Sequence, residues 1–394
     1  MRKVGLIVGT RPEVIKMAPI YRALMSHSVE AVVIFSGQHA NLVDGLFEKF
    51  EIPVDISLAV MEPGQSLNGL FARVLSSVDD LLDRIRFDLV LVHGDTTTAA
   101  ASAIACFNRF VKIGHVEAGL RTGDLARPFP EELNRTLIAR VAGLHFCPTQ
   151  ISASNLEAEG LPMDSVYVVG NTIVDAVDFV RKSHNGMPNW ASMPYCNKYP
   201  DLAQLINSDN MQLLLTTLHR RENIENLPAI CEELKQLVAE NSDIFIALPI
   251  HKNPTVSSIV KSNLDGVPRV FLIDSPDYFD FVPLITRARV IVTDSGGIQE
   301  EAFILGKPLV ILRKSTERPE VLKSLGTVLI GNDYHRIPIE VKRLIALECE
   351  FATDAARAAL GDGAAAKRIA SICENYFNET PILEGSRYFF SSFL

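Results

Sequence analysis

Short runs of apolar, β-branched residues recur along this chain, each followed by a stretch with helical spacing. The runs are apolar on both faces, as expected of parallel strands that helices cover from both sides. They fall into two series: Val4–Val8, Ala31–Phe35, Leu89–Val92, Val111–Val116, Leu144–Phe146 and Val166–Val169, then Gln212–Thr217, Ile244–Leu248, Val270–Ile273, Val290–Val292, Leu309–Leu312 and Val328–Ile330. This alternation predicts an α/β fold with two doubly wound units in series.

The stretches between the runs have the spacing of amphipathic helices. In the first half, helices are expected at Pro12–Met25 and Thr97–Phe107. In the second half, Ile224–Val238 carries a leucine or isoleucine on each turn of one face. Strands and helices therefore alternate as in a series of βαβ units.

The length of the chain and one irregular segment indicate where the units join. The 394 residues suit two domains of about 190 residues each. Residues 184–200 combine proline, asparagine and glycine without a strand or helix period, which is typical of a linker. We therefore expect a first domain at 1–183 and a second at 201–360.

Charge and cysteine content limit the classes of partner. The chain has 38 Lys and Arg against 47 Asp and Glu, a net charge of −9, which argues against a nucleic-acid or anionic-membrane surface. No apolar run approaches the roughly 20 residues of a membrane span. The 6 cysteines are scattered without a C-x-x-C pair, as expected of reduced thiols in a cytoplasmic protein.

Polar residues just after each predicted strand are the candidate ligands, because open parallel sheets bind ligands at the carboxyl ends of their strands. Arg11 and Lys16 follow the first strand, where the dinucleotide fingerprint G-x-G-x-x-G is absent. Two cations at a helix start favour anion binding, although a solvated helix entrance would look the same.

Asp95 and Glu117 follow two further predicted strands that are consecutive along the chain. Each alone could be a structural carboxylate, such as a helix cap. Together with Glu131 or Glu132, which could instead simply favour a helix dipole, they could serve as acid and base.

The second half carries its own candidates at strand ends. His219 and His251 each follow a predicted strand and suit either a structural or a functional role. Ser295, Gly296 and Gly297 lie between a strand and a helix, which favours phosphate binding at the helix N-terminus. A glutamate at this helix start, Glu300 or Glu301, could accept hydrogen bonds from sugar hydroxyls, and Arg313 completes the rim.

A metal site is the alternative use of the acids and His219. These side chains have suitable donor atoms for a divalent cation. The sequence has no dense ligand cluster such as H-E-x-x-H, however, and the cations on the same edge could neutralise a diphosphate. No metal is therefore expected.

Ten ordered motifs closely resemble the non-hydrolysing UDP-N-acetylglucosamine 2-epimerases. They run nearly from end to end of the chain: GTRPEVIKMAPI, LVHGDTTT, GHVEAGLRTGD, PFPEELNR, VVGNTIVDAV, HRREN, IHKNP, TDSGGIQEEA, LGKP and TERPE. The resemblance implies the glycosyltransferase-B architecture, in which two Rossmann-like domains face each other across a cleft. It also implies a last helix, near 361–394, that crosses back onto the first domain.

The family's chemistry supplies roles for the candidate residues. Its members interconvert UDP-GlcNAc and UDP-ManNAc without a cofactor, through elimination of UDP to 2-acetamidoglucal and re-addition, and supply bacterial surface polysaccharide. By resemblance, the catalytic residues are Asp95, Glu117, Glu131 and His219. The implied UDP-binding residues are Arg11, Lys16, Arg135, His251, Phe281 (uracil), Ser295, Gly296, Gly297, Glu301 (ribose) and Arg313. A homodimer is also implied.

Some features leave alternatives open. Many bacterial members bind a second UDP-GlcNAc as activator, and Gln38, His39, Gln65 and Arg220 match those positions in part. Ala40 is smaller than the family's usual residue, so activation stays open. A modified UDP-HexNAc substrate, a hydrolysing epimerase, a glycosyltransferase and a non-catalytic UDP-sugar-binding protein are the rival functions.

Overall fold

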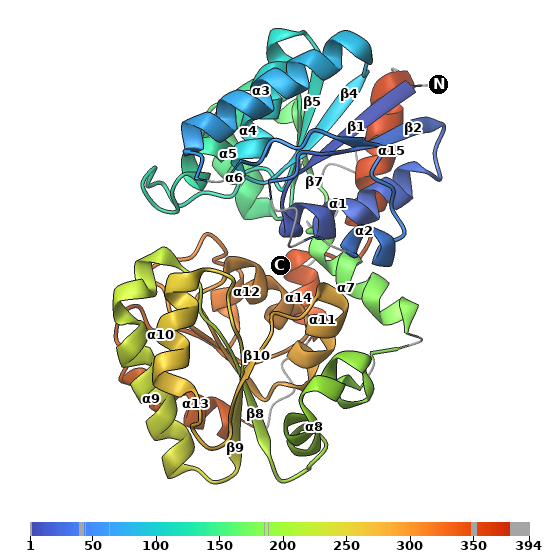
Figure 1. Cartoon of the computed structure of the whole chain (residues 1–394). Coiled ribbons are helices and arrows are strands. Elements are labelled where there is room, and N and C mark those ends of the chain that lie inside the picture. Colours follow the sequence, from blue (N-terminus) through green and yellow to red (C-terminus); the bar gives the residue numbers. More distant parts are fainter. Residues whose placement is uncertain are drawn as a thin grey trace. The chain divides into compact units, whose positions relative to one another are not determined.

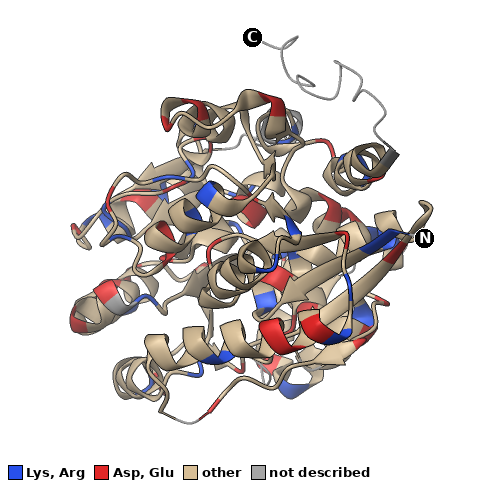
Figure 2. Ribbon diagram, turned by 90° about the horizontal axis from the view of Figure 1, so that it is seen from above, with Lys and Arg blue, Asp and Glu red and all other residues tan. Residues whose placement is uncertain are grey.

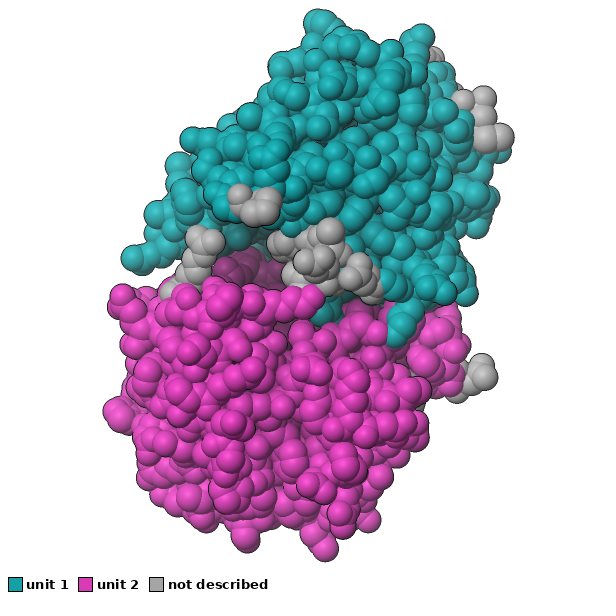
Figure 3. All heavy atoms as spheres, in the orientation of Figure 1, with its two compact units in different colours: residues 1–178, 357–394 teal, residues 179–356 magenta. Residues whose placement is uncertain are grey.

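The structure, a computed structural model, divides into two compact units. Unit 1 comprises Met1–Asp178 and Arg357–Leu394, and unit 2 comprises Phe179–Ala356 (Figure 3). Each unit contains one parallel sheet with helices on its faces, so the predicted fold class is confirmed. The residues described are 2–38, 43, 45–62, 64–184, 186–187, 189–347 and 353–378.

The 7-stranded sheet of unit 1 has the order β3-β2-β1-β4-β5-β6-β7, with every neighbouring pair parallel. Each run predicted in the first half forms a strand. The short β3 was not predicted, because two residues are too few to show a pattern. The strands are β1 (Arg2–Val8), β2 (Val29–Phe35), β3 (Ile56–Ser57), β4 (Leu89–His93), β5 (Lys112–Val116), β6 (Leu144–Cys147) and β7 (Val166–Val168).

Helices cover both faces of this sheet. Helix α3 packs on α4, and the last described helix, α15, packs on α1 although the two lie at opposite ends of the chain (Figure 1). The helices of unit 1 are α1 (Arg11–Leu24), α2 (Leu46–Lys49), α3 (Leu67–Arg84), α4 (Thr97–Asn108), α5 (Glu131–Val141), α6 (Gln150–Ala158), the 3₁₀ turn η2 (Met163–Ser165) and α15 (Ala365–Asn378). Helices α7 (Thr172–Ser183) and α14 (Thr353–Leu360) contain the two unit boundaries.

The 6-stranded sheet of unit 2 has the order β10-β9-β8-β11-β12-β13 and is also parallel. Its strands are β8 (Gln212–Thr217), β9 (Ile244–Pro249), β10 (Val270–Ile273), β11 (Val290–Thr293), β12 (Leu309–Ile311) and β13 (Thr327–Leu329). Its helices are η3 (Trp190–Ser192), η4 (Pro194–Lys198), α8 (Pro200–Ile206), η5 (Arg221–Asn226), α9 (Leu227–Glu240), α10 (Pro254–Leu264), α11 (Tyr278–Arg287), α12 (Gly296–Ile304), η6 (Val321–Lys323) and α13 (Arg336–Ala346).

The core of unit 2 lies on both faces of its sheet. Side chains alternate between the faces along a strand, so Leu214 joins one apolar cluster while Leu213 and Leu215 join the other. The first cluster is filled by α9, α10 and α13, and the second by α8, α11 and α12. This double burial explains why the strands are apolar throughout.

From Trp190 onward, the segment 184–200, expected as a linker, packs into unit 2. Trp190 is 1% exposed and lies in the same cluster as Met193, Cys196 and Leu202. The boundary between the contact units falls earlier, after Asp178 in α7. The irregular composition of the segment therefore accompanies two 3₁₀ turns that are anchored by a tryptophan.

The chain crosses between the units twice, and unit 1 holds its two boundary residues together. Arg357 donates two hydrogen bonds to the Asp178 carboxylate, at 2.6 and 3.1 Å. Close by, the Asn171 amide donates to the Leu360 carbonyl at 2.6 Å. Gly170 and Gly361 pass so closely that a Cβ on Gly361 would lie 3.1 Å from the Gly170 Cα. A side chain at either glycine would separate the two segments.

The charged residues of the described part of the chain do not gather by sign into one region. Figure 2 shows Lys and Arg residues interspersed with Asp and Glu over the described ribbon. Among these residues, no helix has both the length and the apolar character needed to cross a bilayer.

Candidate active site

In each unit the candidate residues gather where the strand order reverses direction. In unit 1 this point lies between β1 and β4, and in unit 2 it lies between β8 and β11. At such a switch point the loops after the two central strands diverge to opposite faces and leave room for a ligand.

The start of helix α1 contacts a residue that follows another strand of unit 1. Arg11 is the first residue of this helix, and Lys16 follows one turn later. The Lys16 Nζ donates to Glu117 Oε1, which lies directly after β5. Lys16 is 4% exposed, so this ion pair is shielded from water. A buried cation is thereby fixed against a candidate acid that is distant in sequence.

Asp95 lies in the turn after β4 and is held by α5. The Arg135 guanidinium donates to Asp95 Oδ2, and the Asn134 amide donates to the Asp95 carbonyl at 2.8 Å. Arg135 is 3% exposed, whereas the Asp95 side chain keeps 25% exposure. The carboxylate is therefore fixed but still reachable by a ligand. The preceding Gly94 has φ 63°, which turns the backbone sharply after the strand.

Glu117 occupies a backbone conformation that is unusual for its residue type. Its φ is 63°, in the left-handed region, where non-glycine residues are uncommon and pay of order 1–3 kcal/mol. One carboxylate oxygen accepts from Lys16, and the other lies 3.6 Å from His93 Nε2. Strain of this kind concentrates at functional sites, where surrounding contacts maintain it.

Glu131 and Glu132 open α5, and the structure separates their roles. Glu132 is 1% exposed, and its Oε1 accepts from the Thr122 and Gly123 amides at 2.9 Å each. Its Oε2 accepts from Arg135 at 3.1 Å. Glu132 therefore anchors the β5–α5 loop, while Glu131 is less deeply buried and its catalytic role stays a prediction.

Burial changes the protonation of three side chains near this sheet edge. Desolvation raises the pKa of Glu13 to about 7, although its hydrogen bonds with Thr96, Gly9 and Thr10 oppose the rise. Burial also lowers the pKa of His115 well below 6.5 and that of His145 to about 4. His115 is thus neutral at pH 7, and its Nε2 donates to the Gly94 carbonyl at 2.7 Å.

In unit 2, Asp294 organises the turn that carries His219. Asp294 is fully buried directly after β11 and accepts from the His219 and Arg220 amides at 3.0 to 3.2 Å. It also accepts from the Asn223 side chain at 3.1 Å and lies 3.5 Å from His219 Nδ1. One carboxylate therefore sets both the backbone and the ring of His219.

His219 and His251 stack on one another. Their ring centroids are 5.4 Å apart, with an interplanar angle of 23°. Burial lowers the pKa of each histidine, and the Asp294 carboxylate opposes that shift. Both imidazoles are therefore neutral at pH 7, and they lie side by side.

The turn from β11 into α12 carries the three residues predicted to bind phosphate. Ser295 is the N-cap residue, and Gly296 and Gly297 open the helix. A Cβ on Gly296 would lie 2.8 Å from the Arg318 guanidinium, whereas a Cβ on Gly297 would meet nothing within 4 Å. Gly296 therefore admits Arg318 beside the turn, and Gly297 leaves the helix N-terminus open to a ligand.

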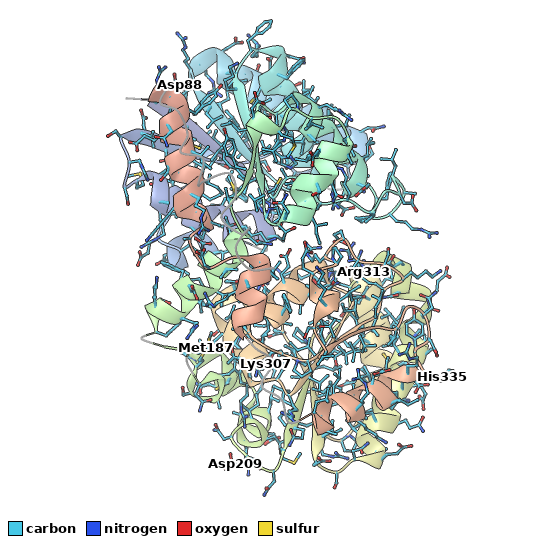
Figure 4. The ribbon with its side chains drawn as sticks, turned by 180° about the vertical axis from the view of Figure 1, so that it is seen from behind. Asp88, Met187, Asp209, Lys307, Arg313 and His335 are labelled. Carbon is cyan, nitrogen blue, oxygen red and sulfur yellow. The ribbon has the colours of Figure 1, made fainter. Side chains whose placement is uncertain are left out.

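Buried ion pairs flank this helix N-terminus. Arg318 donates to Glu300 Oε1 at 2.7 Å and also pairs with Glu317. The charge of Glu300, which would repel an anion at this helix start, is thus offset by Arg318. Arg313, which follows β12 (labelled in Figure 4), lies 3.1 Å from Glu317 Oε2.

Not every predicted residue lies in the two clusters. Phe281 is 8% exposed within an apolar core cluster of unit 2, so its contact with a uracil stays a prediction. Gln38 accepts from Thr98 at 2.7 Å at the end of β2, and Gln65 accepts from Arg73 near the start of α3. His39 lies outside the described residues. Arg220 belongs to the other unit, and the role of all four in activation is untested.

Two buried carboxylates were missed as site residues by the sequence interpretation. Glu13 completes a capping box with Thr10, a spacing that is visible in the sequence as T-x-x-E. Asp294 precedes the Ser-Gly-Gly turn, and its position directly after an apolar strand could have drawn attention to it. Within the described residues, no group of three or more His, Cys, Asp or Glu is arranged to hold a metal ion.

Comparisons with known proteins identify the family of this chain. The family profile described as UDP-N-acetylglucosamine 2-epimerase matches residues 22–374. The UDP-N-acetylglucosamine 2-epimerase of Salmonella typhimurium is 43% identical over 378 residues, which cover 95% of this chain and 99% of that protein. The crystal structure of UDP-GlcNAc 2-epimerase from Neisseria meningitidis bound to UDP-GlcNAc has a TM-score of 0.86 at 37% identity, covering 94% of this chain and 99% of that one.

A more distant structure shares the fold alone. The glycotransferase of kitacinnamycin has a TM-score of 0.64 at 14% identity and covers 95% of this chain and 98% of its own. The profile match and the near full-length identity, by contrast, extend over both units. This chain is an enzyme that belongs to the UDP-N-acetylglucosamine 2-epimerase family.

Proposed function

We propose that this enzyme interconverts UDP-GlcNAc and UDP-ManNAc by elimination and re-addition of UDP. A base removes the C-2 proton while the C-1–oxygen bond breaks, and UDP leaves with the bonding electron pair. The C-1–C-2 double bond of 2-acetamidoglucal results. UDP then returns to C-1 as a proton is delivered to the opposite face of C-2, so atoms and electrons balance without a redox partner.

The arrangement of Asp95 and Glu117 carries this proposal. Asp95 follows β4 and Glu117 follows the adjacent β5, and each carboxylate pairs with its own buried cation, Arg135 and Lys16 respectively. Two separately held acids suit a reaction that needs one proton transfer on each face of a carbon atom. Glu131 adds a third acid at the start of α5.

Unit 2 is assigned to UDP. The open N-terminus of α12 favours negative charge, and Gly297 leaves room there for a phosphate to approach the helix N–H groups, with the Ser295 hydroxyl beside them. Arg313 adds a cation close by, while His219 and His251 offer donors to phosphate oxygens. Glu301, 7% exposed in the same helix, is the proposed ribose acceptor. Stabilising the charge on departing UDP favours elimination.

Incubation of UDP-GlcNAc with the enzyme in deuterated water tests the proposal. We expect UDP-ManNAc to form and deuterium to appear at C-2 of both sugars by NMR. Formation of free ManNAc and UDP would instead identify a hydrolysing epimerase. If C-2 keeps its proton and no epimer forms, the substrate is a modified UDP-HexNAc or the enzyme is an acceptor-dependent glycosyltransferase.

We also propose that the enzyme is a homodimer that associates through unit 1. Helix α5 exposes Leu133 and Leu137 one turn apart, at 40% and 38%. The adjoining α4 exposes Phe107 at 54%, and Phe110 after it is 94% exposed. Exposed apolar side chains on neighbouring helices are typical of an interaction surface.

In a bacterial cell, we expect the cytoplasmic enzyme to supply precursors for surface polysaccharide.

A further inference from the structure

The carboxylate of Glu13 lies between two loops that carry proposed active-site residues. Its Oε2 accepts from the Gly9 amide at 2.8 Å and from the Thr10 amide at 2.7 Å, both directly after β1. Its Oε1 accepts from the Thr96 hydroxyl at 2.6 Å, next to Asp95. Glu13 is 1% exposed, so these bonds are made without competing water.

The hydrogen-bond directions favour the ionised form of Glu13. Backbone N–H groups can only donate, so Oε2 must accept from both Gly9 and Thr10. The Thr96 hydroxyl already accepts from the Ala99 amide at 3.0 Å, and it directs its own hydrogen to Oε1. A proton on Oε1 would reverse that bond and remove the acceptor of the Thr96 hydroxyl hydrogen.

We propose that Glu13 is a positioning residue, which sets Asp95 in place through Thr96 and aligns the first turn of α1. The same turn carries Arg11, and Lys16 one turn later pairs with Glu117. Glu13 and Lys16 thus connect one helix start to the loops after β4 and β5. This inference rests on the proposed function, because Asp95 is the acid that it positions.

Burying the carboxyl group of Glu13 lowers the stability of the fold when the group is ionised, which supports a functional reason for its presence at this position. Burial raises the pKa of Glu13 to about 7 from 4.5, so the folded chain holds the proton more tightly than the unfolded chain does. Stability therefore falls as pH rises from 4.5 through about 7, and an ionised Glu13 lowers it above that range. The charged and titratable groups at this end of the sheet include Arg11, Lys16, His93, Asp95, Glu117 and Arg135.

The decisive variant is Glu13→Gln, which keeps the size of the side chain and removes its charge. We expect kcat to fall about 10- to 100-fold, as for a small displacement of a catalytic group, with KM for UDP-GlcNAc nearly unchanged. The midpoint of urea unfolding at about pH 8 should be no lower than that of the unmodified enzyme. The matched control is Glu48→Gln on the exposed face of α2. This variant should change neither kcat nor the midpoint of urea unfolding.

The pH profile separates positioning from a purely structural role. The kcat of the unmodified enzyme should decline as pH falls through about 7, and Glu13→Gln should lose that limb of the profile. Thr96→Val should lower kcat, and combining it with Glu13→Gln should cause no further loss, because both changes break the same contact. Thr96→Ser keeps the hydroxyl group and should therefore retain the kcat of the unmodified enzyme. Unmodified kcat in Glu13→Gln, or a parallel loss of stability and activity with an unchanged profile, would overturn the proposal.

A spectroscopic measurement keeps this proposal distinct from the proposed reaction. The amide resonances of Gly9, Thr10 and Ala99 should shift together as Glu13 titrates near pH 7, and they should not shift in Glu13→Gln. If the enzyme failed to epimerise UDP-GlcNAc, the proposed function would be wrong, yet these resonances would still report the coupling. If the Gly9 and Ala99 amide resonances shifted with different pH midpoints, the proposed coupling through Glu13 would be wrong, whatever the substrate is.

Discussion

The Arg135 guanidinium donates to the Asp95 carboxylate, so a helix residue fixes an acid that lies 40 positions earlier in the chain. The same guanidinium donates to Glu132 at 3.1 Å, and both Arg135 and Glu132 are almost fully buried. One cation therefore serves an acid that is open to ligand and an acid that holds a loop. The consequences of removing it can be measured.

Replacement Arg135→Leu should abolish most activity and destabilise unit 1. Asp95 would lose its cation, and Glu132 would remain as a buried charge without this partner. We expect kcat to fall at least about 100-fold and the unfolding free energy to fall by about 3 kcal/mol. Steady-state kinetics and urea unfolding provide the two measurements. Arg140→Leu, on the same helix but 57% exposed, is the control and should change neither by much.

Replacement Asp294→Asn should disturb the His219 turn. An amide group cannot accept from all the donors that now face the carboxylate, so at least one N–H group loses its acceptor. We expect a loss of about 1–3 kcal/mol in unfolding free energy, together with a fall in kcat. Asp333→Asn, at an exposed aspartate of the same unit, is the control. Unchanged kcat in Asp294→Asn would remove His219 from the proposed mechanism.

Acid should destabilise the enzyme through its buried neutral histidines. The pKa of His145 is about 4 in the folded chain instead of 6.5, so the unfolded chain binds the proton first as pH falls. The stability that depends on neutral His145 is complete above 6.5 and is lost progressively toward 4. At about pH 5 the loss should reach about 2 kcal/mol.

Comparison of urea unfolding at neutral pH and at about pH 5 tests this expectation. The unmodified enzyme should lose more stability between the two conditions than His145→Gln, whose side chain does not titrate. Equal losses in the two proteins would show that His145 is not the group responsible. His115, whose pKa is lowered further by complete burial, should add to the acid sensitivity of both.

The proposed dimer predicts a change in mass when α5 is charged. Leu137→Glu should convert the dimer to a monomer in light scattering, because it places a carboxylate in the apolar surface of α5. Leu325→Glu, at an 86% exposed leucine of unit 2, should leave the dimer intact. A dimer that survives Leu137→Glu would place the interface elsewhere on the molecule.

The sequence predicted the strands better than the contacts between their ends. Apolar runs mark buried strands, so both sheets were expected, and only the short β3 escaped. Polar residues after these runs also marked Arg11, Asp95 and His219 correctly as strand-end residues. Their grouping follows from the strand order, which a single sequence does not display, and the pairing of Lys16 with Glu117 could not be read from spacing.

Other features depend on local geometry that composition does not reveal. The positive φ of Glu117 violates the usual preference of its residue type, so no propensity argument would find it. Phe281 was assigned to the uracil by family resemblance alone, and its place in an apolar core cluster does not test that contact, which stays a prediction. Glu13 could have been found, since its capping box is a sequence pattern.

The placement of α15 against α1 has a consequence for synthesis on the ribosome. All of unit 2 is translated before residue 365, where α15 begins, although that helix packs on the first helix of the chain. The side of α1 that α15 covers therefore stays without this partner while unit 2 is being synthesised. Unit 1 can therefore complete its fold only after unit 2 has been synthesised, because α15 and Arg357, which pairs with Asp178, both follow that unit along the chain.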